Sequence, residues 1–155
     1  MNQKQLLRPV ADAAALAAPL ANYNTADAVE FLNTLELARA AETLAALPLP
    51  RAVKMLEAPE LHRSGELVAA LPPARAAALL GLMADDRATD IVHELDEEER
   101  ARLIPLLGTD ARQVIQKLLS YPPNTAGALM TTEYVAVPAS WTVAQTLQHI
   151  RQVER

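Results

Sequence analysis

The sequence repeats itself with a period of about 24 residues, the length of a short supersecondary unit. Leu47, Leu71, Leu95 and Leu119 recur at this spacing, and other apolar residues recur at matching offsets between them. The recurring pairs are Phe31-Leu32, Met55-Leu56, Leu79-Leu80 and Leu103-Ile104. A fixed period of this length is typical of units that stack on one another, because one such unit cannot bury its own apolar face. The chain is therefore expected to fold as a repeat array.

Each block of the repeat predicts two short amphipathic helices. Hydrophobic residues make up 51% of the chain and aromatic residues only 3%, with Ala and Leu dominant, and these two lead the helix-propensity ranking. Prolines and acidic residues, which suit the first turn of a helix, stand where helices should begin. For the first helix of a block they are Asp27, Pro50, Pro73 and residues 97–99, and for the second helix they are Asp85, Asp86 and Asp110.

The predicted fold class is all-α, a superhelix of right-handed type built from four short helical hairpins. The handedness does not follow from the period. The alternative is a bundle without repeats, in which Leu-rich helices of similar length imitate a period. Matching residues at several offsets in each block favour the superhelix.

The character of the chain changes after Leu119. Residues 121–130 contain two prolines and a glycine, which predict a linker. The β-branched run 133–137 predicts a strand, and Thr142 is expected to open a helix over 143–153, with Trp141 packing that helix against a sheet. The expected segments are an N-terminal helix or cap (1–22), a helical repeat domain (23–120), the linker (121–130) and the start of an incomplete second domain (131–155).

Composition and charge exclude several classes of function. The absence of cysteine rules out disulfides and thiolate zinc sites and fits a reducing compartment. A net charge of −5 with scattered basic residues argues against nucleic-acid binding. The longest uncharged stretch, 13–24, is too short to span a bilayer. No nucleophile elbow or phosphate loop is present, so no enzyme is expected, and His62, His93 and His149 lie too far apart in sequence to predict a transition-metal site.

A long stretch of the chain resembles a known junction. The segment from Leu118 to Arg151, LLSYPPNTAGALMTTEYVAVPASWTVAQTLQHIR, resembles the region of MgtE-type magnesium transporters where Ala-Gly-x-Leu-Met-Thr and a Val-rich strand lead into the first CBS domain. The upstream hairpins with Leu-Pro-Pro look like that family's cytoplasmic N domain, which extends the resemblance over residues 20–155.

The resemblance implies a regulatory function. In that family Mg²⁺ bound between the N and CBS domains holds a homodimeric membrane pore closed. The chain would then lie on the cytoplasmic side of the cell membrane, with its own CBS and transmembrane domains as partners and Mg²⁺ as the bound ion. This chain itself is expected to be soluble, with no membrane span.

The resemblance also indicates ligands. An ungapped alignment on Leu71-Pro72-Pro73 places Asp86 and Asp90 at the family's paired sensor carboxylates. In the Ala126-Gly127-Ala128 linker, the resemblance implies that Ala128 stands where the family can lend a backbone carbonyl to the ion. Two carboxylates four residues apart near a helix start project from one face, and Mg²⁺ takes oxygen ligands while keeping several waters. The other interpretation is that Asp85 and Asp86 simply suit a helix start and that Asp90 faces solvent. Both remain open from the sequence.

Two departures from the family pattern predict a weaker sensor. Lys54 stands where the same alignment places another carboxylate, and a fixed cation there repels Mg²⁺. Glu57, one turn further on, offers compensation. Ala128 keeps a carbonyl group but lacks the conformational freedom of glycine.

A second class of function is a scaffold for protein–protein interactions, since the helical repeats are also similar to segments of the flagellar motor switch protein. The Ala-Gly-x-Leu-Met-Thr junction favours the transporter.

Overall fold

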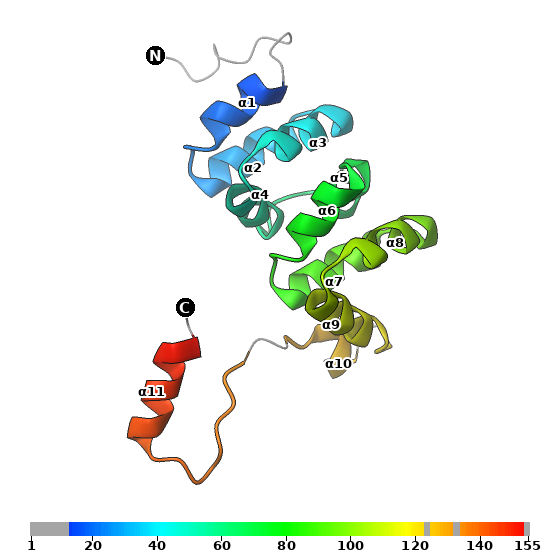
Figure 1. The fold of residues 1–155 in the computed structure, drawn as a ribbon. Helices are drawn as coiled ribbons and strands as arrows, with labels where there is room; N and C mark the ends of the chain where they lie inside the picture. Colours follow the sequence, from blue (N-terminus) through cyan, green and yellow to red (C-terminus); the bar gives the residue numbers. More distant parts are fainter. Residues whose placement is uncertain (1–12, 123–124, 132–133, 154–155) are drawn as a thin grey trace.

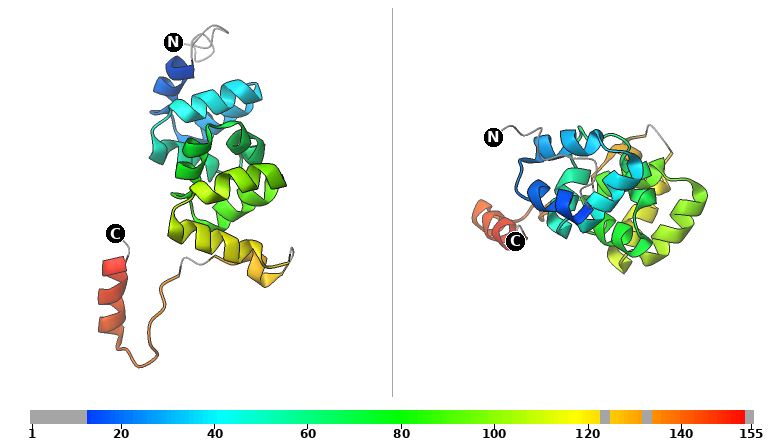
Figure 2. Two further views of the ribbon diagram at one scale, coloured as in Figure 1. Left: turned by 45° about the vertical axis from the view of Figure 1, so that its right-hand side comes forward. Right: turned by 90° about the horizontal axis from the view of Figure 1, so that it is seen from above.

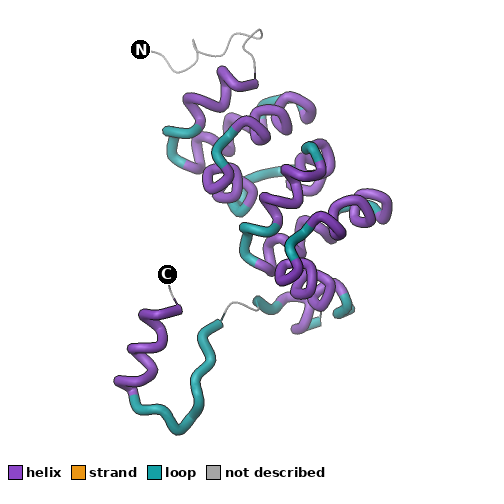
Figure 3. Tube along the Cα trace, viewed as in Figure 1, coloured by secondary structure: helices purple, strands orange, loops and turns teal. Residues whose placement is uncertain are grey.

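The structure is a computed structural model that describes residues 13–122, 125–131 and 134–153. These residues form helices and loops with no strand (Figure 3), so the predicted all-α class is confirmed. The helices are α1 (Ala13–Leu20), α2 (Thr25–Asn33), α3 (Leu37–Ala46), α4 (Leu49–Leu56), α5 (Ser64–Ala70), α6 (Pro73–Leu80), α7 (Asp85–Glu94), α8 (Glu97–Leu103), the 3-10 helix η2 (Ile104–Leu106), α9 (Thr109–Leu119), α10 (Ala126–Leu129) and α11 (Val143–Val153).

The predicted repeat of helical hairpins is confirmed. The helices α2, α4, α6 and α8 each open a hairpin, and their first residues, Thr25, Leu49, Pro73 and Glu97, follow the period of the sequence. We refer to hairpin 1 (α2 and α3), hairpin 2 (α4 and α5), hairpin 3 (α6 and α7) and hairpin 4 (α8, η2 and α9). These hairpins follow one another along a stack (Figure 1).

The stack has two layers (Figure 2). In one layer, α1, α3, α5, α7 and α9 each contact the next, and in the other α2, α4, α6 and α8 do the same. The apolar faces of the two layers meet in one continuous core that runs from Ala17 to Ile115. Each hairpin therefore buries its apolar surface largely against its neighbours.

The periodic leucines mark the passage from one hairpin to the next. Leu47, Leu71 and Leu95 are the C-caps of α3, α5 and α7, each with extended backbone and each buried. Pro48 and Pro72 follow at the N-caps of α4 and α6. A proline disfavours helical backbone in the residue before it, so the Leu-Pro pairs end one helix and leave the leucine side chain in the core.

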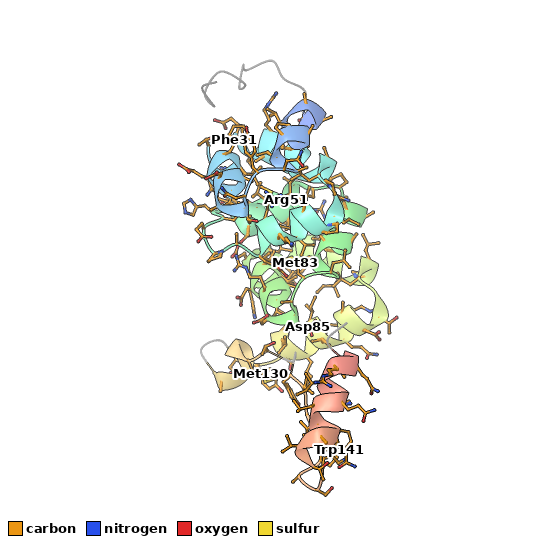
Figure 4. The ribbon with its side chains drawn as sticks, turned by 90° about the vertical axis from the view of Figure 1, so that its left-hand side faces the viewer. Phe31, Arg51, Met83, Asp85, Met130 and Trp141 are labelled. Atoms are coloured by element: carbon orange, nitrogen blue, oxygen red, sulfur yellow. The ribbon has the colours of Figure 1, made fainter. Side chains whose placement is uncertain are left out.

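Arginines tie neighbouring hairpins together. Arg51 of α4 donates hydrogen bonds to the carbonyl oxygens of Leu20 (3.1 Å) and Tyr23 (2.7 Å). Arg75, at the equivalent position one repeat later on α6, donates in the same way to the carbonyl oxygen of Leu47. Figure 4 shows Arg51 in the N-terminal half of the stack. In hairpin 4 the equivalent position is Glu99, so this pattern of donors ends there.

Part of the predicted linker over 121–130 is helical. Residues Ala126–Leu129 form α10, which contacts α9. Gly127 lies against the ring of Tyr121 so closely that a Cβ atom at residue 127 would come within 2.5 Å of Cδ1 of the ring. The absence of a side chain at Gly127 is what permits this contact.

The predicted strand at 133–137 is not formed. Glu133 lies outside the described residues, and 134–137 have no strand structure. A strand needs a second strand for its backbone N–H and C=O groups, and no strand is present in the described part of the chain.

The helix predicted at 143–153 is confirmed as α11, with the side chains of Thr142 and Gln145 capping its start. Trp141, which precedes α11, lies edge-on to the ring of His149 within that helix, at 5.3 Å between centroids. The boundaries of the four expected segments remain predictions, and residues 1–12 of the first segment lie outside the described residues.

Candidate metal site

The start of α7 carries the predicted metal ligands. Asp86 lies in the first turn, half-buried, and its Oδ1 accepts a hydrogen bond from the backbone N–H of Arg87 at 2.9 Å. Asp90 lies one turn further and is exposed. The helix thus uses one oxygen of Asp86 at its N-terminus, where a carboxylate is favourable, and presents Asp90 to solvent.

The N-terminus of α7 receives a carboxylate from another hairpin. Its N-cap is Ala84, whose side chain offers no hydrogen-bond acceptor. Glu57 ends α4 as its C-cap, is half-buried, and accepts a hydrogen bond from the Ala84 N–H through Oε1 at 2.9 Å. The sequence singled out Glu57 only as a compensating ligand, and its bond to the start of α7 was missed. Its repeat equivalent one period earlier is Asn33, and no sequence signal marks either residue as a contact between hairpins.

Lys54 lies on the same helix as Glu57, one turn earlier. It is exposed in the last turn of α4, where a cation interacts favourably with the C-terminal end of the helix dipole. Lys54, which departs from the family pattern, therefore lies on α4, the helix whose C-cap residue Glu57 bonds to the N-cap of α7.

Ala128 lies on a different helix from the two aspartates. In α10 its N–H donates to the carbonyl oxygen and, at 3.4 Å, to the hydroxyl oxygen of Thr125, and the residue is half-buried. Because α10 contacts α9 and α9 contacts α7, the predicted ligands are distributed over two helices that share α9 as a neighbour.

The donor set fits part of a magnesium site. Asp86 and Asp90 offer carboxylate oxygens, which Mg²⁺ prefers, and this ion keeps several waters, so two protein ligands on one surface are chemically adequate for a shared site. Within the described residues, no three His, Cys, Asp or Glu side chains come together as a group able to hold a metal ion. Further ligands would have to come from a second surface.

No helix of the described residues combines the length and the apolar character needed to cross a membrane.

Comparison with known proteins identifies the family. No curated protein matches the chain in sequence. A crystal structure described as the soluble part of a magnesium transporter is similar, with a TM-score of 0.57 and 25% sequence identity. The match covers 91% of this chain and 62% of the other, so this chain spans under two thirds of that structure. The model of the MgtE intracellular N domain matches residues 23–124. This chain therefore belongs to the MgtE intracellular N domain family.

Proposed function

We propose that the chain is the cytosolic Mg²⁺-sensing region of an MgtE-like magnesium transporter. The family match and the similarity to the soluble part of a magnesium transporter support a regulatory function rather than catalysis. The observation that carries the proposal is the pair Asp86 and Asp90, two carboxylates in the first turns of α7, at the positions that the family resemblance indicates. The same comparisons favour this function over an interaction scaffold.

In this proposal α7 holds one half of a shared ion site. One oxygen of Asp86 is occupied by the Arg87 N–H, which leaves its second oxygen and both oxygens of Asp90 to face Mg²⁺. Facing carboxylates of a CBS domain supply the other half. Without the ion the two acidic surfaces repel each other, and with the ion they are bridged, so ion concentration changes the distance between the domains. The carbonyl group of Ala128 is the proposed ligand from the linker.

The ion-bridged state closes the pore in this proposal. The intact protein is a homodimer whose pore lies in the membrane, and this chain lies on the cytoplasmic side. Lys54 supplies a positive charge where a carboxylate would strengthen ion binding, so the bridging is expected to be weaker than in relatives with an acid there.

The test compares the Asp86→Ala, Asp90→Ala double variant with an Asp110→Ala control in the intact transporter. Asp110 is the repeat equivalent of Asp86 on α9, but the residue four positions later is Val114, so it offers no carboxylate pair. The readout is the Mg²⁺ concentration that protects the junction at 121–131 from protease, together with inhibition of transport by internal Mg²⁺.

The double variant should need on the order of tenfold more Mg²⁺ for protection, within the usual range of coupling between sites, and its transport should be less inhibited. The Asp110→Ala control should behave as the wild type. Equal protection of wild type and double variant would mean that Asp86 and Asp90 only stabilise the start of a helix, and the proposal would be wrong.

A further inference from the structure

Two polar side chains at equivalent repeat positions reach the next hairpin. Asn33 and Glu57 stand one repeat apart, at the ends of α2 and α4. The Asn33 side chain accepts a hydrogen bond from the His62 N–H at 3.0 Å and donates one to the Glu60 carbonyl oxygen at 2.8 Å. Glu57 accepts its bond from the Ala84 N–H. In both cases the first helix of one hairpin holds the loop before the second helix of the next.

The turn before α7 is the last turn in the repeat series that a side chain at this position can bond. The next equivalent position is Gly81, which has no side chain to reach hairpin 4. The turn that Glu57 holds leads directly into the helix that carries Asp86 and Asp90, two and six residues after Ala84. The bond is half-buried, where a hydrogen bond to a carboxylate is stronger than one exposed to water.

Glu57 supplies a hydrogen bond at the N-cap of α7, where the N-cap residue itself, Ala84, has no side-chain acceptor. Alanine is among the poorest N-cap residues, since it provides no acceptor for the first N–H groups. Without Glu57 the Ala84 N–H would lose its partner, and the turn that leads into α7 would no longer be tied to the end of α4. The placement of the first turn of α7, which carries Asp86, is thus linked to Glu57.

We propose that Glu57 is a positioning residue for the ion site, acting through its bond to the Ala84 N–H and not as a ligand. This inference rests on the proposed function of Asp86 and Asp90. Glu57 fixes the first turn of α7 against α4, so the two aspartates are held in the orientation that an ion needs before it arrives. Fixing ligands in advance raises affinity because binding no longer bears the entropy of ordering them.

Three variants of the 155-residue chain, compared with the wild type and with the Asp86→Ala, Asp90→Ala double variant, separate positioning from other effects. Glu57→Ala removes both the acceptor and the charge. Glu57→Gln keeps an acceptor oxygen without the charge. Asn33→Ala removes the equivalent contacts one hairpin earlier. It is the control for the stability that Glu57→Ala loses, because it leaves the contact with the start of α7 in place. Backbone amide NMR follows a titration with MgCl₂ at constant ionic strength through the signals of residues 85–91, and hydrogen exchange follows the Ala84 amide.

In Glu57→Ala, the Mg²⁺ midpoint should rise about fivefold, the ratio that corresponds to the loss of one hydrogen bond, and the Ala84 amide should exchange faster. Glu57→Gln should stay within about twofold of the wild type, because an amide oxygen can still accept the bond. Asn33→Ala should lower the melting temperature as Glu57→Ala does and leave the midpoint unchanged.

Each other result overturns the inference in a distinguishable way. If Glu57→Gln is as impaired as Glu57→Ala, the charge of Glu57 acts on the ion directly. If Asn33→Ala shifts the midpoint equally, the effect is general loss of stability. Suppose that the Asp86→Ala, Asp90→Ala variant abolishes the Mg²⁺ response but Glu57→Ala leaves the midpoint or the Ala84 exchange rate unchanged. The positioning by Glu57 is then refuted, and the proposed function stands. If that double variant titrates like the wild type, the proposed function fails, and this inference fails with it.

Discussion

The carboxylate of Glu94 binds the start of α5. From the end of α7, its carboxylate accepts hydrogen bonds from the Gly65 N–H at 2.7 Å and the Ser64 hydroxyl at 3.1 Å. The N-cap of α5, Arg63, has φ 58° and provides no side-chain cap. A carboxylate from the next hairpin therefore satisfies the start of α5, whereas the start of α7 receives Glu57 from the preceding hairpin. The backbone can approach this closely only because residue 65 has no side chain.

Replacing Gly65 with alanine should destabilise the fold by about 1–3 kcal/mol, the usual cost of forcing an extra group into a packed site. A Cβ at this position would lie 2.5 Å from Cβ of Glu94 and 2.8 Å from its Oε2, so α7 would have to shift. Urea unfolding followed by circular dichroism measures the change.

Gly108→Ala is the control, because a Cβ there meets nothing within 4 Å. Its small loss as an N-cap and its gain from a stiffer unfolded chain should nearly cancel. If the two variants unfold at the same urea concentration, the contact between Gly65 and Glu94 contributes nothing to stability.

At the candidate site, the sequence predicted the positions of residues that lie on the same helix. The spacing of Asp86 and Asp90 placed both at the start of α7 because a helix start follows from local preferences. The bonds of Glu57 and Glu94 could not be predicted, since each joins residues 27 to 30 positions apart. Such contacts depend on how hairpins stack, and the sequence specifies that only through the repeat period.

At the scale of elements, α10 is the helix that depends most on a contact outside itself. It has four residues, too few for a helix to be stable alone. The Tyr121 ring lies against Gly127, and Thr125 at the N-cap accepts a weak bond from the Ala128 N–H. The position of Ala128 therefore depends on a ring at the end of α9.

Gly127→Ala should release α10 from α9. A Cβ would lie 2.5 to 2.9 Å from three atoms of the Tyr121 ring, so the ring would have to leave its place. Hydrogen exchange of the Ala128 amide should become faster, whereas exchange in α3, α5 and α7 should not change. Tyr121→Ala should have the same effect, because it removes the same contact. Unchanged exchange at Ala128 in both variants would show that α10 is held by something else.

The elements that the sequence predicted well are those fixed by local patterning. The period of apolar residues, with prolines for α4 and α6 and acidic residues for α2 and α8, predicted these four helices, and Thr142 predicted the start of α11. The strand at 133–137 was wrong because β-branched residues favour a strand only where a partner is available. The helix α10 was missed because Pro122, Pro123 and Gly127 are typical of loops, while the ring contact that supports it is tertiary.

At the scale of the whole molecule, burial differs sharply between the stack and the segment after it. The core unites the helices from α1 to α9, whereas α11 has no buried residue. Tyr134 is 75% exposed and Val143 77% exposed. After α10 the chain leaves the stack, as Figures 1 and 2 show.

Hydrogen exchange in the 155-residue chain should divide it into two parts. Amides in the core of residues 25–119 should exchange only through cooperative opening, whereas those of 134–153 should be nearly unprotected, because few apolar contacts oppose local opening there. A chain that ends at residue 120 should melt at nearly the same temperature. Strong protection of α11 that persists on dilution would mean that it packs on the stack; protection that is lost on dilution would mean that it pairs with a second copy.

The arginine contacts between hairpins have a consequence for how such arrays change over time. Arg51 and Arg75 both bind main-chain carbonyl oxygens, a group that every amino acid supplies, and Arg51 also donates to the Thr25 hydroxyl. Substitution at Tyr23 or Leu47 leaves the acceptor in place, so a duplicated hairpin finds its partner on any preceding unit without a matching mutation. Gene duplication can therefore lengthen or shorten this kind of stack by whole hairpins, and Glu99, where an arginine would stand, marks the unit at which the series stops.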